Sequence, residues 1–598
     1  MLYPQRNRYR DTIDLNGIWS FRPDPDDTGE RNGWNNGFAD GMDIAVPGSW
    51  NEQLEEFGLM NYIGAGWYST TVFIPADAEG KSILLRIGSA DYHAAVWVNG
   101  RSAGENQFGF LPFEIPLNGF VVPGETALIV IRVDNRLTND TVPQGITSEL
   151  YEQEQRLREE TFPPARYDFT PFGGIHRPVK LMLLPKSHLE SIIASTSLEG
   201  TDGRLSLTIS AGNISSAVIS AELSGVNGKF TAETTLRNGN GTVEMRIPEC
   251  RCWSPEDPYL HSLTVRLRHN ENVTDEYTLP VGIRDVKIVN GELLLNGKKI
   301  YLKGFGKHED SSVIGKGLSL PFMVKDFSLM RWINANSFRT SHYPYAEEVM
   351  FAADRLGFLV IDEVPAVSLD FRHTTDKTLL HHKEYFRRLF ARDASHPCVI
   401  MWALGNEPNL AGDPNYTTGP APKYWSEVFA SAKALDPIRP MVVPNCLRAG
   451  IDDPVMALSD IICINRYYGW YEYPGRLEKG ITMLEREMEA IHRRYGKPMM
   501  MTEFGADTVP GQHSTSDQMF TEEYQVKLLT EYIRLLRSKP YVVGEHVWNF
   551  ADFKTPQNMR RVVQNLKGVF TRTRSPKAAA FTLRTLWTES RKGTAEEA

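Results

Sequence analysis

The second half of this chain contains a repeating alternation that few folds can accommodate. After about residue 286, short apolar runs alternate with longer segments of helical periodicity, such as Thr521–Ser538. This alternation is typical of parallel βα units, whose strands are buried on both faces. Eight runs within roughly 300 residues predict a closed (β/α)8 TIM barrel. The predicted strands are Lys299–Phe305, Ala335–Thr340, Phe358–Glu363, Val399–Asn406, Met441–Pro444, Ile461–Arg466, Met499–Glu503 and Val543–Trp548.

The first half of the chain has a different pattern, in which turn residues separate short strands of alternating character. This pattern predicts two β-sandwiches, the second of which has the size of one immunoglobulin-like domain. We therefore expect domains at residues 1–184, 185–285 and 286–598. The clearest strands are Ser82–Ile87, His93–Val98, Leu128–Val133, Arg204–Ile209, Thr242–Ile247 and Ser262–Leu267.

Composition narrows the functional class. A chain of 598 residues is too long for one hydrophobic core, which fits several domains. The net charge of −9 is spread without blocks, so nucleic acid and anionic membranes are not expected partners. No apolar run suits a signal peptide or a membrane span, and the five scattered cysteines favour reduced thiols. We expect a cytoplasmic protein, with a tail after Thr588 that has no function.

Two glutamates follow apolar runs that we expect to be barrel strands. Glu407 comes after the fourth run and Glu503 ends the seventh. Because the chemistry of such barrels is located where the strands end, both side chains are expected in one mouth. Retaining glycoside hydrolysis uses a pair of this kind, a protonated carboxyl as acid and an ionised carboxylate as nucleophile. We predict Glu407 as general acid/base and Glu503 as nucleophile, with Arg339 supporting the ionised form of Glu503.

A single glutamate at a strand end is more often a helix cap or an ion-pair partner than a catalytic group. Two at matched positions favour catalysis, and other polar and aromatic residues end the same runs. Aromatic walls with polar groups between them are what a pyranose ring needs. These residues are His308, Arg339, His342, Asp362, Glu363, Asn465, Tyr467, Trp470, Tyr471, Glu545 and Trp548.

Five motifs stand out: Gly405-Asn406-Glu407-Pro408, Thr502-Glu503-Phe504-Gly505, Phe172 to Pro178, Trp253 to Leu260 and Asn336 to Pro344. With these motifs the chain resembles the family 2 glycoside hydrolases over nearly its whole length. The resemblance implies a jelly-roll, sugar-binding-like sandwich, then an immunoglobulin-like sandwich, then a catalytic TIM barrel. It also implies a homo-oligomer, commonly a tetramer. No metal-ligand spacing is present, so we expect no cofactor and no metal.

Within that family the chain looks most like the β-glucuronidases. The resemblance is carried by Gly304 to Asp310, Asn465 to Tyr471, Trp548 to Phe553, and Arg561 with the element Asn565-Leu566-Lys567. It implies that Arg561, Asn565 and Lys567 bind the carboxylate of a uronic acid. An arginine can hold a carboxylate in a bidentate fork, and the ammonium and the amide can satisfy its remaining lone pairs. Taken alone, such a basic loop is more often a solvated surface.

The resemblance also implies the remaining contacts with the sugar. Asn406 is expected at the 2-hydroxyl, and Asp168 and His308 at other hydroxyls. The substrate site is completed by Asn465, Tyr467, Tyr471 and Trp548. Asp168 belongs to the first sandwich, so its role requires a loop of that domain to reach the barrel mouth. Otherwise Asp168 is a turn residue before Phe169, an interpretation that stays open.

The segment between Ala366 and Lys383 is shorter than in the best-known bacterial relatives, which carry an insertion that covers the aglycone side. A shorter loop predicts a more open site and a preference for larger glucuronides.

We predict a bacterial-type, exo-acting retaining β-glucuronidase that releases glucuronic acid from β-D-glucuronides. Four alternatives stay open at this point: a β-galacturonidase or a β-galactosidase of the same family, a transglycosylase that uses the same intermediate, and a non-catalytic carbohydrate-binding protein. Intact Glu407 and Glu503 argue against the last of these.

Overall fold

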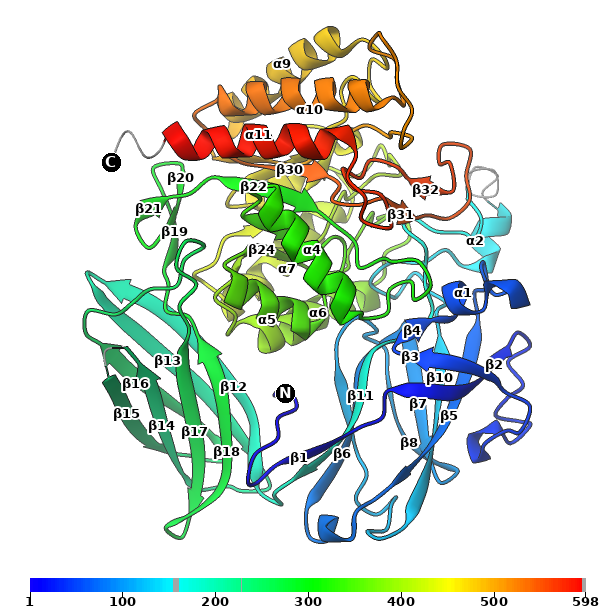
Figure 1. The fold of residues 1–598 in the computed structure, drawn as a ribbon, viewed down its shortest axis with the longest axis vertical. Coiled ribbons are helices and arrows are strands. Elements are labelled where there is room, and N and C mark those ends of the chain that lie inside the picture. Colours follow the sequence, from blue (N-terminus) through cyan, green and yellow to red (C-terminus); the bar gives the residue numbers. More distant parts are fainter. Residues whose placement is uncertain (154–160, 227, 594–598) are drawn as a thin grey trace.

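The computed structural model describes residues 1–153, 161–226 and 228–593. Two β-sandwiches form the lower part of the molecule in Figure 1, and a barrel surrounded by helices lies above them. Each of the three parts has its own hydrophobic core. The fold class expected from the sequence is therefore confirmed.

The barrel is a parallel sheet that closes on itself. Its nine strands run in the order β26-β25-β24-β23-β22-β30-β29-β28-β27. The two ends of this order, β26 and β27, are parts of one chain segment; β26 pairs with β25 and β27 with β28. The ring thus has eight strand positions, as predicted. The strands are β22 (Leu302–Gly306), β23 (Ser337–Arg339), β24 (Leu359–Glu363), β25 (Val399–Ala403), β26 (Met441–Val442), β27 (Asn445–Cys446), β28 (Ile462–Asn465), β29 (Met499–Glu503) and β30 (Val542–Trp548).

Helices surround this sheet and bury its outer face (Figure 1). The helix predicted at Thr521–Ser538 is α10, and its N-cap Thr521 accepts a hydrogen bond from Tyr524 N. The last helix continues to Gly593, so the part of the predicted tail between Thr588 and Gly593 is helical, while 594–598 lie outside the described residues. The helices are α4 (Leu320–Trp332), α5 (Glu347–Leu356), α6 (Asp376–Asp393), α7 (Ala421–Leu435), α8 (Pro454–Leu458), α9 (Leu477–Tyr495), α10 (Glu522–Arg537) and α11 (Ala578–Gly593).

Two strand predictions were wrong in detail. Lys299 does not belong to the first barrel strand but to β21, the last strand of a small antiparallel sheet that precedes the barrel. The fourth strand ends at Ala403, so Asn406 and Glu407 lie on a loop beyond it. The predicted run begins before the first ladder residue of β22 and continues past the last one of β25, and sequence alone does not mark either point. This small sheet contains β19 (Val286–Val289), β20 (Glu292–Leu295) and β21 (Lys298–Lys299).

The first sandwich contains a five-stranded and a six-stranded sheet, and the second contains a three-stranded and a four-stranded sheet. All of their pairings are antiparallel, with apolar residues alternating toward the core. The first sandwich contains β1 (Asp11–Asp14), β2 (Gly17–Asp24), β3 (Met42–Val46), β4 (Gly48–Ser49), β5 (Ala65–Phe73), β6 (Ser82–Asp91), β7 (His93–Val98), β8 (Arg101–Asn106), β9 (Phe113–Pro116), β10 (Thr126–Asp134), β11 (Gly174–Leu184) and the short helices α1 (Trp50–Gln53) and α2 (Ser148–Gln153). The second contains β12 (His188–Glu199), β13 (Asp202–Gly212), β14 (Val218–Gly225), β15 (Gly228–Thr235), β16 (Asn240–Ile247), β17 (His261–His269) and β18 (Asn272–Val281).

A segment of the first sandwich reaches the barrel mouth. Phe162 and Gln557 exchange two backbone hydrogen bonds, of 2.9 and 2.7 Å, and Thr170 N donates to Lys554 O at 3.1 Å. Lys554 and Gln557 belong to the chain after β30, where β31 (Phe553–Lys554) and β32 (Gln564–Asn565) form a hairpin. The chain around Asp168 therefore lies against this hairpin.

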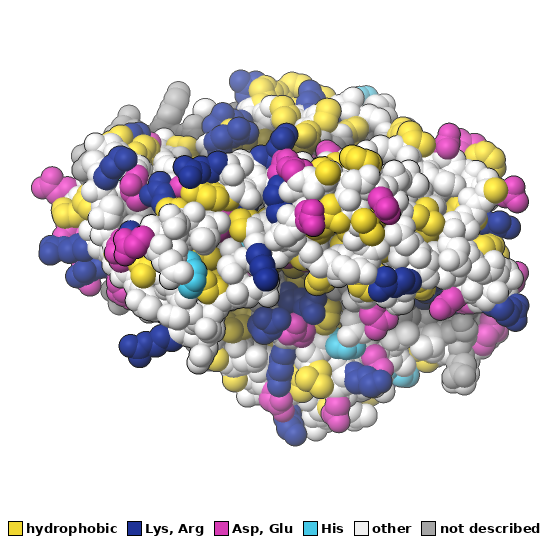
Figure 2. Space-filling model, turned by 90° about the horizontal axis from the view of Figure 1, so that it is seen from below, with side chains coloured by type: hydrophobic (Ala, Val, Ile, Leu, Met, Phe, Trp, Pro, Cys, Tyr) yellow, Lys and Arg dark blue, Asp and Glu magenta, His cyan; other side chains and the backbone are white. Residues whose placement is uncertain are grey.

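The surface carries no block of one charge on the face seen in Figure 2, where basic and acidic side chains lie interspersed with apolar ones. Among the helices of the described ranges, none has the length and apolar character needed to cross a membrane. All five thiols are free, and the closest pair, Cys250 and Cys252, has its sulfur atoms 3.6 Å apart.

Candidate active site

Glu407 lies on the loop that follows β25. Its φ is +47°, an uncommon value for a residue with a side chain, and its backbone N–H donates to Pro444 O at 2.8 Å. The preceding Asn406 N donates to Ala366 O at 3.1 Å. The loop is therefore fixed between its two neighbouring strands, and the left-handed backbone conformation of Glu407 is of the kind that clusters at functional sites.

Glu503, the last residue of β29, is 4% exposed and lies in a dense set of charged and hydroxyl groups. One of its oxygens pairs with the guanidinium of Arg339, and the other accepts a hydrogen bond from the Tyr467 hydroxyl at 2.7 Å. Arg339 is itself completely buried and also pairs with Glu363 at 2.5 Å. These contacts hold the Glu503 carboxylate in one orientation and stabilise its charge.

An amide network joins the two glutamates. Asn465 Nδ2 donates to Glu407 Oε1 at 3.0 Å and to Asn406 Oδ1 at 3.1 Å, and Asn406 Oδ1 also lies 3.3 Å from Arg339 Nη1. Thr502 Oγ1 donates to Asn465 Oδ1 at 2.7 Å and so fixes the amide orientation. We refer to Glu407 and Glu503 as the carboxylate pair.

The two members of the carboxylate pair are in different electrostatic environments. Burial and, secondarily, the charge of Glu503 raise the pKa of Glu407 to about 8. The single amide donor from Asn465 does not offset this. Glu407 therefore keeps its proton at neutral pH, as a general acid must, while Glu503 has the guanidinium partner.

Aromatic rings line the mouth beside the carboxylate pair. Trp548, at the end of β30, stacks on His342 with ring centroids 5.1 Å apart and meets His308 edge-on at 5.5 Å. His308 also packs on Phe169 of the first sandwich, at 5.0 Å. Its Nδ1 lies 3.2 Å from the Tyr343 hydroxyl, whereas its Nε2 has no hydrogen-bond partner among the described residues. A buried polar atom of this kind at the mouth suits a ligand hydroxyl.

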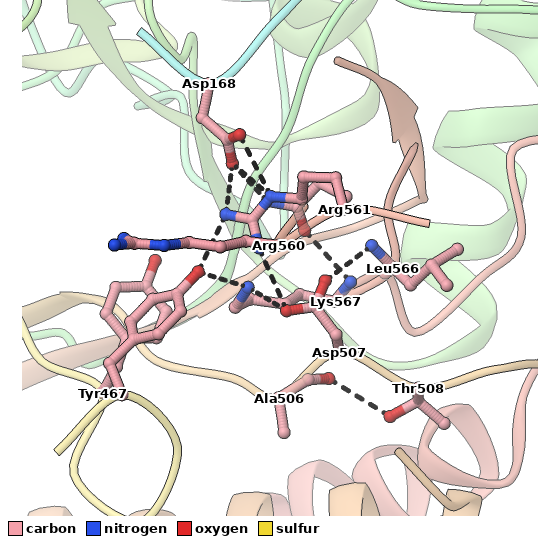
Figure 3. Close-up of polar contacts among 12 residues, drawn as sticks. Asp168, Tyr467, Ala506, Asp507, Thr508, Arg560, Arg561, Leu566 and Lys567 are labelled. Atoms are coloured by element: carbon pink, nitrogen blue, oxygen red, sulfur yellow. Dashed lines mark hydrogen bonds and ion pairs between the residues drawn. The ribbon is translucent and has the colours of Figure 1, made fainter. Parts of the chain in front are cut away.

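A second polar group, the cationic cluster, consists of Arg561, Lys567, Asn565, Asp507 and Asp168 (Figure 3). The Arg561 guanidinium lies between the two aspartates, 2.6 Å from Asp168 and 3.3 Å from Asp507. Lys567 is 1% exposed and pairs with Asp507, while Asn565 Nδ2 donates to Asp168 at 2.8 Å. Two cations thus face two carboxylates, and these side chains come from the first sandwich, the chain after β29 and the chain around β32.

Two tyrosines connect the carboxylate pair with the cationic cluster. The Tyr467 hydroxyl donates to Glu503, and its ring packs against Tyr471 with centroids 5.2 Å apart. The Tyr471 hydroxyl accepts hydrogen bonds from both Arg561 and Lys567, each at 2.8 Å. A ligand at the carboxylate pair would therefore also be close to the cationic cluster.

Sequence reasoning missed Asp507 and wrongly added two strand-end carboxylates. Asp507 was detectable, because it follows the end of β29 by four residues. Asp362 instead accepts a hydrogen bond from Thr340 Oγ1 at 3.0 Å, and Glu545 contacts Arg537 at 2.8 Å. Neither contacts the carboxylate pair. Adjacent residues of a strand point to opposite faces, so Glu363 lies inside the barrel and Asp362 outside.

Trp402 of β25 precedes Glu407 by five residues but packs against the surrounding helix α6. Its indole donates to Asp436 at 2.8 Å, and its ring packs on Phe386 and Phe390 of α6.

The three parts of the chain match three family models. Residues 13–185 match the sugar binding domain of glycosyl hydrolases family 2, residues 187–284 the second family 2 model, and residues 286–591 the family 2 TIM barrel domain. This chain belongs to glycoside hydrolase family 2.

Relatives in family 2 match over nearly the full length. A curated β-glucuronidase of Paenibacillus borealis is 40% identical over 607 residues, covering 98% of this chain and 99% of that protein. The human β-glucuronidase is 39% identical, covering 98% and 92%. A solved structure of a Ruminococcus gnavus β-glucuronidase in complex with D-glucaro-1,5-lactone has a TM-score of 0.90 at 34% identity, covering 98% and 99%. The same protein has been solved with D-glucuronic acid, with a TM-score of 0.89.

The short loop after β24 is attached to the first sandwich. Asp370 pairs with Arg166 at 2.9 Å, and its backbone N–H donates to Gln144 Oε1 at 2.9 Å. Farther along, Thr375 Oγ1 donates to Asp140 at 2.6 Å. In this family 2 chain the loop after β24 and the first sandwich thus form one wall of the barrel mouth together.

One cluster in the described part of the chain has the composition of a metal site, namely Asp354, His396 and Cys398. It lies where β25 begins, at the other end of the strand from Glu407. Both Asp354 oxygens already accept hydrogen bonds, from His396 Nδ1 at 2.5 Å and from Cys398 N at 3.0 Å. A hydrogen-bonded network explains this cluster without a cation.

Proposed function

We propose that this family 2 hydrolase is an exo-acting, retaining β-glucuronidase. The observation that carries the proposal is the pairing of two sites through Tyr467 and Tyr471, a carboxylate pair on one side and a cationic cluster on the other. The carboxylate pair suits glycosidic bond cleavage. The cationic cluster suits a sugar that carries a carboxylate. The relatives named β-glucuronidase, one of them solved with D-glucuronic acid, support the same substrate.

In the first step, Glu407 protonates the glycosidic oxygen while the Glu503 carboxylate attacks the anomeric carbon. The raised pKa of Glu407 supplies the proton, and Arg339 and Tyr467 orient the attacking oxygen. The aglycone leaves as an alcohol, and the sugar remains as an ester of Glu503. Burial of this charge network excludes bulk water from the reacting bonds.

In the second step, the Glu407 carboxylate removes a proton from water, which attacks the same carbon and releases Glu503. Two inversions give β-glucuronic acid as the first product. Asn406, held by Arg339 and Asn465, is placed to bind the 2-hydroxyl, where hydrogen bonds strengthen in the transition state.

The remaining residues bind the sugar. Lys567 and Asn565 bind the carboxylate, and Arg561 joins them once the substrate competes with Asp168 for its guanidinium. His308 offers its free Nε2 to a hydroxyl beside the Trp548 wall. The side chain of Asp168 is 39% exposed, so it can turn from Arg561 toward a hydroxyl.

Hydrolysis of p-nitrophenyl β-D-glucuronide, galacturonide and galactoside tests the substrate. We expect the glucuronide to be cleaved fastest, by at least about 10²-fold over the neutral galactoside, because one desolvated charge pair discriminates by about that factor. Preference for the galacturonide or the galactoside would replace the substrate assignment by that alternative. Sugar binding without turnover would favour a carbohydrate-binding protein.

The stereochemistry is tested separately by proton NMR of early product. A retaining enzyme releases the β-anomer first, and an initial α-anomer would exclude Glu503 as the nucleophile. Added alcohol acceptors would reveal a transglycosylase through new glucuronides. The tetramer, the cytoplasmic location and the preference for larger aglycones stay predictions.

A further inference from the structure

Lys577 is a buried cation outside the groups of residues described so far. It precedes α11 and is 1% exposed. Its ammonium donates to Asp552 Oδ1 at 2.8 Å and to the carbonyl oxygens of Thr508 and Leu566, each at 2.9 Å. An ammonium has three protons, so all of its donors are used.

Two of these acceptors are sequence neighbours of the cationic cluster. Thr508 follows Asp507, and Leu566 precedes Lys567 (Figure 3). The two segments also bond directly, because Thr508 N donates to Leu566 O and Leu566 N to Asp507 Oδ1, each at 2.9 Å. Lys577 thus links the backbone of Leu566, next to Lys567, with the backbone of Thr508, next to Asp507.

Gln525 of α10 contacts the same two segments. Its side chain is completely buried, and its Nε2 lies 3.2 Å from the carbonyl oxygens of Lys567 and Gly568 and 3.4 Å from that of Ala506. Asp552, the carboxylate partner of Lys577, also holds the segment of Lys567, since its Oδ1 accepts a hydrogen bond from Gly568 N at 2.9 Å. Gln525 on α10 and Lys577, just before α11, therefore fix the same spacing from two different parts of the chain.

A fully buried ammonium is rare and costly unless it is completely paired. An apolar side chain could fill the same volume at lower desolvation cost. What the ammonium adds is a fixed distance between the segment of Asp507 and the segment of Lys567. Because Asp507 orients the Lys567 ammonium, this distance determines where that charge is presented.

We propose that Lys577, together with Gln525, is a positioning residue that sets the preference of this site for an anionic sugar. The proposal rests on the proposed function, since the cationic cluster selects substrate only if the sugar carries a carboxylate. Lys577 touches no substrate and acts through the placement of Lys567.

The test uses two probes that differ in one group, uronic isofagomine with a carboxylate and isofagomine with a hydroxymethyl group. Their affinities are measured by calorimetry for the wild type and for Lys577→Met. We expect the affinity for uronic isofagomine to fall by about tenfold or more, because small misplacements of a binding group cost that much. The affinity for isofagomine should change by less than about threefold.

A matched control is Lys303→Met. Lys303 is another buried lysine, on β22, and its ammonium donates to Trp587 O at 3.1 Å, away from the cationic cluster. This variant should not alter the ratio of the two affinities. An equal change of that ratio in both lysine variants would overturn the proposal, because it would show a general effect of losing a buried charge.

A double variant separates positioning from a direct contribution. In the Lys567→Ala background, Lys577→Met should reduce the affinity for uronic isofagomine by less than about twofold, because its effect passes through Lys567. Full additivity of the two losses would contradict the proposal.

If the Lys577→Met variant does not fold, the double variant Lys577→Met with Asp552→Asn also removes the carboxylate that would be left unpaired. Gln525→Met provides an independent second variant.

Wild type that binds both probes equally would reject the proposed function and this inference together. Wild type that prefers the uronic probe, with variants that keep the same preference, would reject this inference alone.

Discussion

The carboxylate pair and the cationic cluster are neighbouring regions with opposite charge balance. Around the carboxylate pair, Arg339 is the guanidinium partner of Glu363 and Glu503, whereas burial and, secondarily, the charge of Glu503 raise the pKa of Glu407. In the cationic cluster, two cations face two aspartates. Under the proposed function, the acid is a carboxyl that burial keeps protonated, and the substrate carboxylate binds to cations whose present partners it can replace.

The largest effect on activity is expected when the nucleophile is removed. Glu503→Gln should lower kcat on p-nitrophenyl β-D-glucuronide by on the order of 10⁴-fold or more, because an amide cannot form the covalent intermediate. The loss should be equal for uronic and neutral glycosides, measured by steady-state kinetics with each. A loss confined to the glucuronide would mean that Glu503 belongs to binding rather than to bond cleavage.

A substitution in the cationic cluster should instead affect the uronic substrate and not the neutral one. Lys567→Ala should reduce kcat/KM for the glucuronide by about 10²-fold, because it removes one partner of a desolvated charge pair, and leave the galactoside rate unchanged. Lys554→Ala is the matched control, since Lys554 is also ion-paired, with Glu52 at 2.8 Å, and lies on the neighbouring strand β31. Indifference of the glucuronide rate to Lys567 would remove the substrate assignment.

The pH dependence of kcat/KM tests the raised pKa of Glu407. With the pKa of Glu407 raised to about 8, the acid is protonated below that pH and is lost above it. We expect kcat/KM to fall tenfold per pH unit on the alkaline side, starting near pH 8. This limb should be absent in Glu407→Gln. An unchanged limb in that variant would assign it to another group.

The smallest effect concerns stability. The pKa of Glu407 is raised in the folded protein, so between its ordinary value and about 8 the folded state holds a proton that the unfolded state has lost. Stability therefore decreases as pH rises through this interval, and Glu407→Gln escapes that loss. We expect the Tm advantage of the variant to grow by about 2 °C or more between pH 5 and 8 in scanning calorimetry. A constant difference would contradict the assigned shift.

The barrel strands were predictable because burial on both faces leaves a continuous apolar signal, as in Met499–Glu503. The direction of individual side chains was not, since neighbouring residues of one strand serve opposite faces, as Glu363 and Asp362 do. Lys577 gave no sequence signal at all. Its role depends on three acceptors up to 69 residues away, which only the folded chain brings together.

The contact between Phe162 and Gln557, together with Asp168 beside Arg561, means that the proposed binding site is formed by residues of two domains. The barrel carries the complete carboxylate pair, whereas one wall and one carboxylate at the sugar-binding end come from the first sandwich. A chimaera that joined this barrel to the sandwich of another family member would keep its cleavage chemistry but receive a foreign specificity element. Exchange by recombination should therefore succeed only when the sandwich segment and the hairpin of β31 and β32 are transferred together.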